Sequence, residues 1–198
     1  MFTLSEPHTD DVARFINSQS KLAFSYPEAG ATRFGSAAAP RGFTVDHNRI
    51  RLGQGIVVFE RAVAALKRWQ HFNLGWVTVV PAGVKVEKDA VVAVKARACG
   101  TWSLSACRVV YLFDEQQPNP RFGFAYGTLP DHVERGEERF LIEWDTTDDG
   151  IWYDILAFSQ PRHPLVKLGA PVARMLQKRF ARESLAAMKS AVSDVVAG

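Results

Sequence analysis

Cysteine is scarce in this chain, and its spacing indicates neither a metal site nor a disulfide framework. Cys99 and Cys107, the two cysteines among the 198 residues, lie in apolar, strand-like surroundings. They form no C-x-x-C pair and have no metal-type spacing with histidine, so we expect a reduced, buried pair rather than a disulfide. The five histidines include no i, i+4 pair. The sequence therefore predicts no metal site and no cofactor.

Long apolar runs and targeting signals are also lacking. No window approaches the roughly 18 apolar residues that a membrane-spanning helix needs. The first residues, 1–6, lack the basic stretch and apolar run of a secretion signal. We therefore expect a cytoplasmic protein without a transmembrane segment. The serine-hydrolase motif G-x-S-x-G does not occur, and Gly53-Gln54-Gly55 lacks the other residues of a phosphate-binding loop.

The composition is that of an ordinary globular protein, with 47% hydrophobic and 23% charged residues. The net charge of +3 does not by itself indicate nucleic acid. Basic residues are concentrated between Arg162 and Lys189, where Glu183 is the one acid. Such a helix face can bind polyanions or acidic membranes, but the solvated side of an amphipathic helix is the commoner explanation, and we favour it.

Aromatic and basic residues also meet near position 70, the mixture that single-stranded nucleic-acid binders use. Trp69 and His71 lie beside Lys67 and Arg68. Because Trp69 falls on the apolar stripe of a predicted helix, core packing explains it better. We do not expect nucleic acid as a partner.

The pattern of hydrophobic residues divides the chain into an N-terminal extension, residues 1–40, packed on a domain formed by residues 41–198. Thr9 can cap a short helix in the extension. In the domain, a strand over 43–52 precedes a helix with one apolar stripe. That stripe comprises Ile56, Phe59, Val63, Leu66 and Trp69.

From Trp76 onward the hydrophobic period becomes two, which predicts a series of strands. Strands this closely spaced must be antiparallel. The expected ranges are 76–80, 84–86, 92–97, 102–113, 121–129, 138–144 and 151–158. A helix of about 25 residues then begins near Pro171 and must pack on the sheet. Its apolar stripe is Val172, Met175, Leu176, Phe180, Met188 and Val192.

One predicted strand, 121–129, has a bulky face and a bare face. The bulky face carries Phe122, Phe124 and Tyr126, whereas the bare face carries only glycine and alanine. A bare face lets another backbone or a ligand come near, or else allows the sheet to curve. Both explanations stay open.

This order of elements resembles the START-related and birch-pollen-allergen-like helix-grip superfamily. That resemblance implies an α+β fold in which a curved antiparallel sheet wraps around a long C-terminal helix, with a hydrophobic ligand between them. A closer resemblance is to the uncharacterised family called domain of unknown function nineteen-ninety, or uncharacterised protein family 0548. It rests on residues 26–32, 52–55, 124–130, 136–140 and 157–161, and it implies a fold but no activity.

Glu138 is the sharpest candidate for chemistry. On a strand it shares the apolar face of Phe140, Ile142 and Trp144. A carboxyl group there has a raised pKa unless it is paired, and it could bind a ligand or act as a general acid or base. The alternatives are that Glu138 is exposed to solvent at the end of the strand, or that it forms a structural ion pair with Arg108 or Arg139.

We expect non-catalytic binding of a small hydrophobic or amphipathic molecule, in preference to an enzyme. Tyrosine hydroxyls would orient such a guest in an apolar pocket. The expected ligand-binding residues are Phe124, Tyr126, Glu138, Phe140, Ile142, Trp144 and Tyr153. One alternative is a cyclase- or hydrolase-type enzyme that uses Glu138 with Tyr126 or His163. Another is a protein-interaction module that uses the basic C-terminal helix. The sequence does not indicate an oligomeric state.

Overall fold

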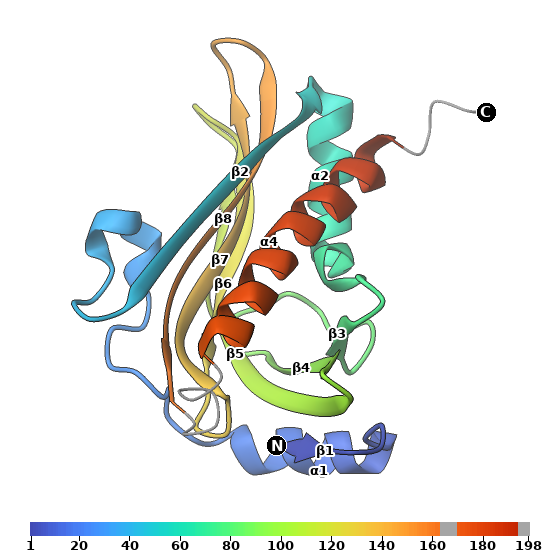
Figure 1. Cartoon of the computed structure of the whole chain (residues 1–198). Helices are drawn as coiled ribbons and strands as arrows, with labels where there is room; N and C mark the ends of the chain where they lie inside the picture. The colour runs from blue at the N-terminus through green and yellow to red at the C-terminus, as the bar shows by residue number, and fades with distance from the viewer. Residues whose placement is uncertain (163–169, 194–198) are drawn as a thin grey trace.

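The computed structural model describes residues 1–162 and 170–193 and confirms the predicted helix-grip, START-like architecture. A strongly curved antiparallel sheet wraps around a long C-terminal helix, α4 (Ala170–Ser193) (Figure 1). The sheet order is β2-β8-β7-β6-β5-β4-β3, and β1 pairs with β5. The strands are β1 (Phe2–Thr3), β2 (Thr44–Gln54), β3 (Val77–Val80), β4 (Val91–Ala98), β5 (Thr101–Glu115), β6 (Arg121–Thr128), β7 (Glu134–Asp145) and β8 (Gly150–Pro161).

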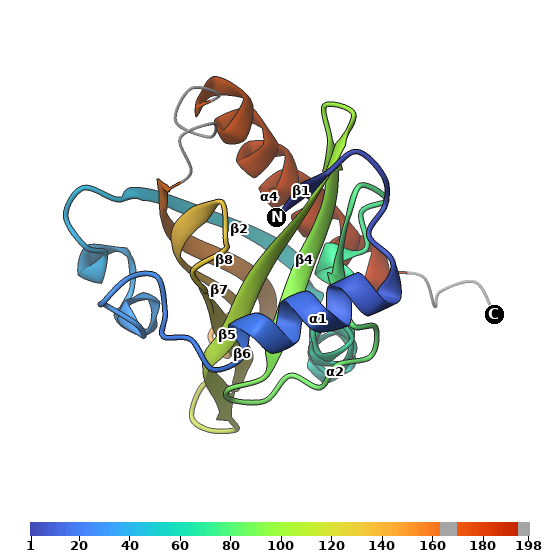
Figure 2. The same ribbon diagram turned by 90° about the horizontal axis from the view of Figure 1, so that it is seen from below.

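Apart from β1, which pairs with β5, the N-terminal residues lie on the outer face of the sheet, opposite α4. Helix α1 (Thr9–Gln19) crosses the outer side of β4 and β5 (Figure 2). Its buried Val12 and Phe15 pack with Leu104, Ala106 and Leu129. Two short 3-10 helices, η1 (Ala31–Phe34) and η2 (Ser36–Ala38), follow before β2 begins.

Helix α2 (Ile56–Lys67) contacts α4, β2 and β7. The predicted stripe is correct at Phe59 and Leu66, but Ile56 is half exposed. The helix also ends earlier than expected. Trp69 adopts a left-handed backbone conformation with φ 58°, and the short helix η3 (Gln70–Phe72) follows it. Trp69 is nevertheless buried, so it packs in the core from outside the helix.

Helix α4 has 24 residues, close to the expected length, and Leu176, Phe180, Met188 and Val192 of the predicted stripe face the cavity or the core. Met188 and Val192 are buried in the core, as expected, whereas Met175 is 58% exposed. The position between Phe180 and Met188 that faces the sheet is Ser184, which is fully buried. Because Ser184 is polar, the apolar pattern of the sequence does not mark this position as buried.

Two further expectations are wrong. The residues around Val84 and Val86 do not form a strand. Cys107 is buried, but Cys99 is exposed because it lies in the turn between β4 and β5, with φ 51°. Both thiols are free.

The bare face of β6 is its outer face, and other parts of the chain come close to it. At Gly127, an added Cβ atom would lie 2.1 Å from the hydroxyl oxygen of Tyr26, so the N-terminal segment uses this space. At Gly123, the same atom would lie 2.4 Å from the carbonyl oxygen of Phe140 on the neighbouring strand. The backbones of β6 and β7 therefore approach closely where the sheet bends.

Within residues 1–162 and 170–193, no helix is both long and apolar enough to cross a membrane.

The Gly127→Ala variant should be less stable than the natural protein by about 1–3 kcal/mol, because the new methyl group overlaps Tyr26. In a Tyr26→Phe background the same change should cost less, since the nearest atom is gone. Urea denaturation of the four proteins of this double-mutant cycle measures the coupling. Strictly additive effects would show that Tyr26 does not occupy this space in solution.

Candidate functional site

A cavity of about 1010 Å³ lies between the concave face of the sheet and the N-terminal half of α4. Its walls come from β2, β4, β5, β6, β7 and β8 and from one side of the helix. This volume is at the upper end of the range for small-molecule sites, about 300–1,000 Å³.

The cavity exists because small side chains face it from β4 and β5. The two strands pair so that Val94 lies opposite Ser105, Ala96 opposite Ser103 and Ala98 opposite Thr101. All six side chains line the cavity. Since none of them reaches far from the sheet, α4 can cross this region without contacting it.

The apolar part of the lining comes from α4 and from the segment after α2. Leu176, Phe180 and Leu185 face the cavity from the helix, and Phe72 and Trp76 face it from the opposite side. Phe180 packs on Phe72 with ring centroids 4.8 Å apart. These contacts mark the end of the cavity, beyond which the interior is solidly packed.

Glu138 and Tyr126 provide a polar point in the cavity wall. They are directly opposite each other on β7 and β6, and the Tyr126 hydroxyl donates a hydrogen bond to Glu138 Oε2 at 2.8 Å. Burial raises the pKa of Glu138 to about 7; the hydrogen bond from Tyr126 opposes this shift, and the charges of Glu134 and Asp46 add to it. Burial raises the pKa of Tyr126 well above its usual range, so Tyr126 remains a hydrogen-bond donor.

Neither Arg108 nor Arg139, the two arginines considered as structural partners, pairs with Glu138 in the described part of the chain. Arg139 points to the outer face, where it donates to the carbonyl oxygen of Thr32 and to Asp154. Arg108 donates to the carbonyl oxygens of Ser20 and Leu22. Neither guanidinium group is therefore available to neutralise Glu138.

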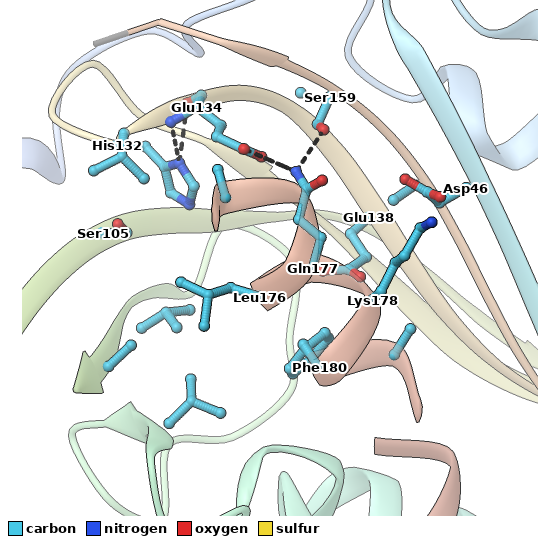
Figure 3. A pocket seen from close by; sticks show the side chains of 18 of the residues that line it. Asp46, Ser105, His132, Glu134, Glu138, Ser159, Leu176, Gln177, Lys178 and Phe180 are labelled. Atoms are coloured by element: carbon cyan, nitrogen blue, oxygen red, sulfur yellow. Dashed lines mark hydrogen bonds between the residues drawn. The ribbon is translucent and has the colours of Figure 1, made fainter. Parts of the chain in front are cut away.

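A second polar group lies where α4 begins to cross the sheet. Gln177 Nε2 donates to both carboxylate oxygens of Glu134, at 2.8 and 2.7 Å, and to Ser159 Oγ at 3.1 Å (Figure 3). Arg174 forms a two-pronged ion pair with Asp46 on β2. Sequence reasoning missed these residues, because 128 positions separate Asp46 from Arg174.

The other expected ligand-binding residues face the same side of the sheet but do not line the cavity. Phe124, Phe140, Ile142 and Tyr153 are fully buried in the core. Rings from η3 cover them, and the ring centroids of His71 and Phe140 are 4.5 Å apart. Trp144 packs on Phe59 of α2, at the far end of the core. His163 lies outside the described residues.

His71 is fully buried among aromatic rings, and neither of its ring nitrogens has a hydrogen-bond partner within residues 1–162 and 170–193. Burial lowers its pKa to about 3, so the ring is neutral. Trp69 stacks beside it. Both rings are therefore inaccessible to the bases of a nucleic acid.

The outer face of β7 carries a different carboxylate, Glu137, which sequence reasoning did not single out. Glu137 accepts hydrogen bonds from the Tyr26 hydroxyl (2.7 Å), the Gly30 amide (2.6 Å), and both the amide (2.9 Å) and the hydroxyl of Thr32. Two segments on which the family resemblance rests, 26–32 and 136–140, meet at this point. Their contact fixes the N-terminal residues to the sheet.

No group of three or more histidine, cysteine, aspartate or glutamate side chains in the described part of the chain could hold a metal ion.

Comparison with known proteins identifies relatives over nearly the whole chain. The model of the family described as "Domain of unknown function (DUF1990)" matches residues 25–187. A "UPF0548 protein" of Dictyostelium discoideum is 38% identical over 209 residues, which cover 98% of this chain and 97% of the relative.

Among solved structures, TTHA0849 from Thermus thermophilus matches with a TM-score of 0.54 at 12% identity, over 78% of this chain and 100% of that chain. Human STARD10 matches with a TM-score of 0.48 at 13% identity, over 96% of this chain and 82% of that chain. At 12% identity, TTHA0849 shares only the fold with this chain.

Replacing Glu138 by Gln should change how stability depends on pH. A glutamate in the unfolded chain titrates near 4.5, and in the folded protein Glu138 titrates at about 7. The folded state thus binds more protons between these values, and the stability this gives is lost as the pH rises through about 7. As the pH rises from about 5 to about 8, the free energy of unfolding of E138Q, measured in urea, should therefore increase relative to that of the natural protein.

The Tyr126→Phe variant provides a directional control. Because the Tyr126 hydroxyl lowers the pKa of Glu138, its removal should move the transition to higher pH. Parallel pH profiles for the natural protein and E138Q would contradict the assignment.

Proposed function

The chain belongs to the DUF1990 family, also called UPF0548, and we propose that it binds a small hydrophobic or amphipathic molecule between the sheet and α4. The observation that carries this proposal is the cavity of about 1010 Å³, whose lining is mostly apolar. Enclosed apolar surface with a few convergent polar groups is the usual form of a small-molecule site.

The size of the cavity supports a guest on energetic grounds. Apolar void costs about 24 cal/mol for each Å³, so a dry void of this size would cost on the order of 20 kcal/mol. That exceeds the whole stability of a typical domain, about 5–15 kcal/mol. Solvent or a guest must therefore fill the space, and an apolar guest gains about 25 cal/mol for each Å² that it buries.

A second candidate function is an enzyme of the cyclase or hydrolase type with Glu138 as acid or base. The observation in its favour is the pKa of about 7, because a general acid or base works best near the operating pH. Tyr126 would supply a hydrogen bond to the same carboxyl group. Such an enzyme with Glu138→Gln should keep its ligand and lose turnover, whereas a binding protein should change only in affinity.

The interaction-module alternative has less support, because much of the basic charge on α4 is engaged within the chain. Arg174 pairs with Asp46, and Arg179 pairs with Glu183 at 2.7 Å. Lys189 donates to the carbonyl oxygens of Arg51 and Leu52. If a partner does bind this helix, charge reversal at Lys178, Arg179 and Arg182 should abolish that binding.

Native mass spectrometry of the freshly purified protein tests the proposed function directly. We expect a bound small molecule that is released on unfolding and can be identified by extraction. The variant Ala96→Phe places a ring in the cavity and should lose that molecule while remaining folded.

The matched control is Arg97→Phe, which adds the same ring at the exposed neighbouring position of β4. It should retain the bound molecule. Equal occupancy in both variants would place the ligand elsewhere and overturn the proposed function.

A further inference from the structure

The polar wall of the cavity is acidic, and two of its acids, Asp46 and Glu138, lie in one row across the sheet. Asp46 on β2 lies opposite Ala157, Ala157 lies opposite Glu138, and Glu138 lies opposite Tyr126. Neighbouring strands are about 4.8 Å apart, so the two carboxylates lie two strand spacings apart across a small alanine. Glu134 lies on the same strand as Glu138 and also lines the cavity.

These three carboxylates differ in how they are neutralised. Asp46 has the guanidinium group of Arg174. The side chain of Glu134 accepts hydrogen bonds from neutral donors, and the nearby charge of Arg174 also stabilises its ionised form. Among the hydrogen bonds of residues 1–162 and 170–193, the side chain of Glu138 has only that from Tyr126. Tyr126 contacts Oε2, which leaves Oε1 of Glu138 free to accept a hydrogen bond from inside the cavity.

Among residues 1–162 and 170–193, no other group facing the cavity pairs with the charge of Glu138. Lys178 and Arg182 border it from the exposed side of α4, and in the described part of the chain neither forms an ion pair with Glu134 or Glu138. Burial lowers the pKa of His132 to about 4, so this ring is neutral. The Cys107 thiol and the Tyr153 hydroxyl lie in the core near Glu138 and do not line the cavity. Burial raises the pKa values of both well above their usual ranges, so neither carries a charge.

We propose that the cavity selects amphipathic molecules whose polar end is a protonated amine, held by the free oxygen of Glu138, with the hydrocarbon part lying against Leu176 and Phe180. This inference rests on the proposed function and names the class of its ligand. An ammonium group donates a charge-assisted hydrogen bond to a carboxylate. An alcohol also donates a hydrogen bond to the carboxylate but brings no positive charge to neutralise it, and the carboxylate of a fatty acid meets uncompensated charge of its own sign.

Three ligands with the same chain separate these cases: decylamine, decanol and decanoate. Each competes at pH 8 with the neutral fluorescent probe N-phenyl-1-naphthylamine. The amine should bind at least about tenfold more tightly than the alcohol, as a charged hydrogen bond implies, and decanoate should bind most weakly. Lowering the pH to about 5 protonates Glu138, so the preference for the amine over the alcohol should shrink.

Two substitutions test whether Glu138 causes the preference for the amine. Glu138→Gln should reduce the preference for decylamine over decanol by about tenfold and leave decanol affinity nearly unchanged. The control Glu143→Gln removes a carboxylate from the outer face of the same strand, where Glu143 pairs with Arg49 at 3.3 Å. It should keep the full preference.

The outcomes separate the two proposals. Decanoate binding as tightly as decylamine, or an amine preference that survives in E138Q, would overturn the amine assignment and leave the binding function intact. If neither the probe nor any of the three ligands binds, the proposed function itself fails.

Discussion

Helix α4 is held over the concave face of the sheet at two places that differ in chemistry, and the hollow beneath it depends on both. In its C-terminal half, Met188 and Val192 are buried in the core, and the Ser184 hydroxyl lies 3.0 Å from that of Tyr153. Near its N-terminus, polar side chains bridge to the sheet through the Arg174–Asp46 and Gln177–Glu134 contacts. Long polar side chains hold the helix at a distance, whereas direct apolar packing would draw it onto the small residues of β4 and β5.

The alternation of side chains along β7 places two adjacent glutamates in opposite roles. Glu137 points outward and accepts four hydrogen bonds, all from the segment between Tyr26 and Thr32. Its capacity as an acceptor is used within the chain, so it is suited to fixing that segment. Glu138 points inward and accepts one hydrogen bond from the described residues. The number of donors around each carboxyl group, and not its residue type, distinguishes the structural group from the one that can meet a guest.

Local periodicity explains which parts of this arrangement can be predicted from sequence. A period of two assigns Glu138 and Phe140 to one face of a strand, and this holds whatever the neighbouring strands are. Which inward residues border a hollow, however, depends on what else fills the interior. Phe140 is covered by His71 and Phe72 of η3, and no pattern in β7 records that contact. The bridge between Asp46 and Arg174 depends on where α4 crosses the sheet, which no pattern within the helix records.

The energetic cost of Glu138 explains why an acid in the cavity wall points to a role in binding. Glu138 lies partly buried in the cavity wall, where a carboxylate is less stable than one in bulk solvent, and its pKa of about 7 reflects that cost. A glutamine or methionine of similar volume would fill the same position without the penalty. A guest with a positively charged donor recovers the free energy that desolvation of the carboxylate costs, whereas a purely apolar guest leaves the penalty in place. For the proposed guest, apolar contacts would supply most of the affinity, while Glu138, one of three carboxylates in the cavity wall, would orient its polar end.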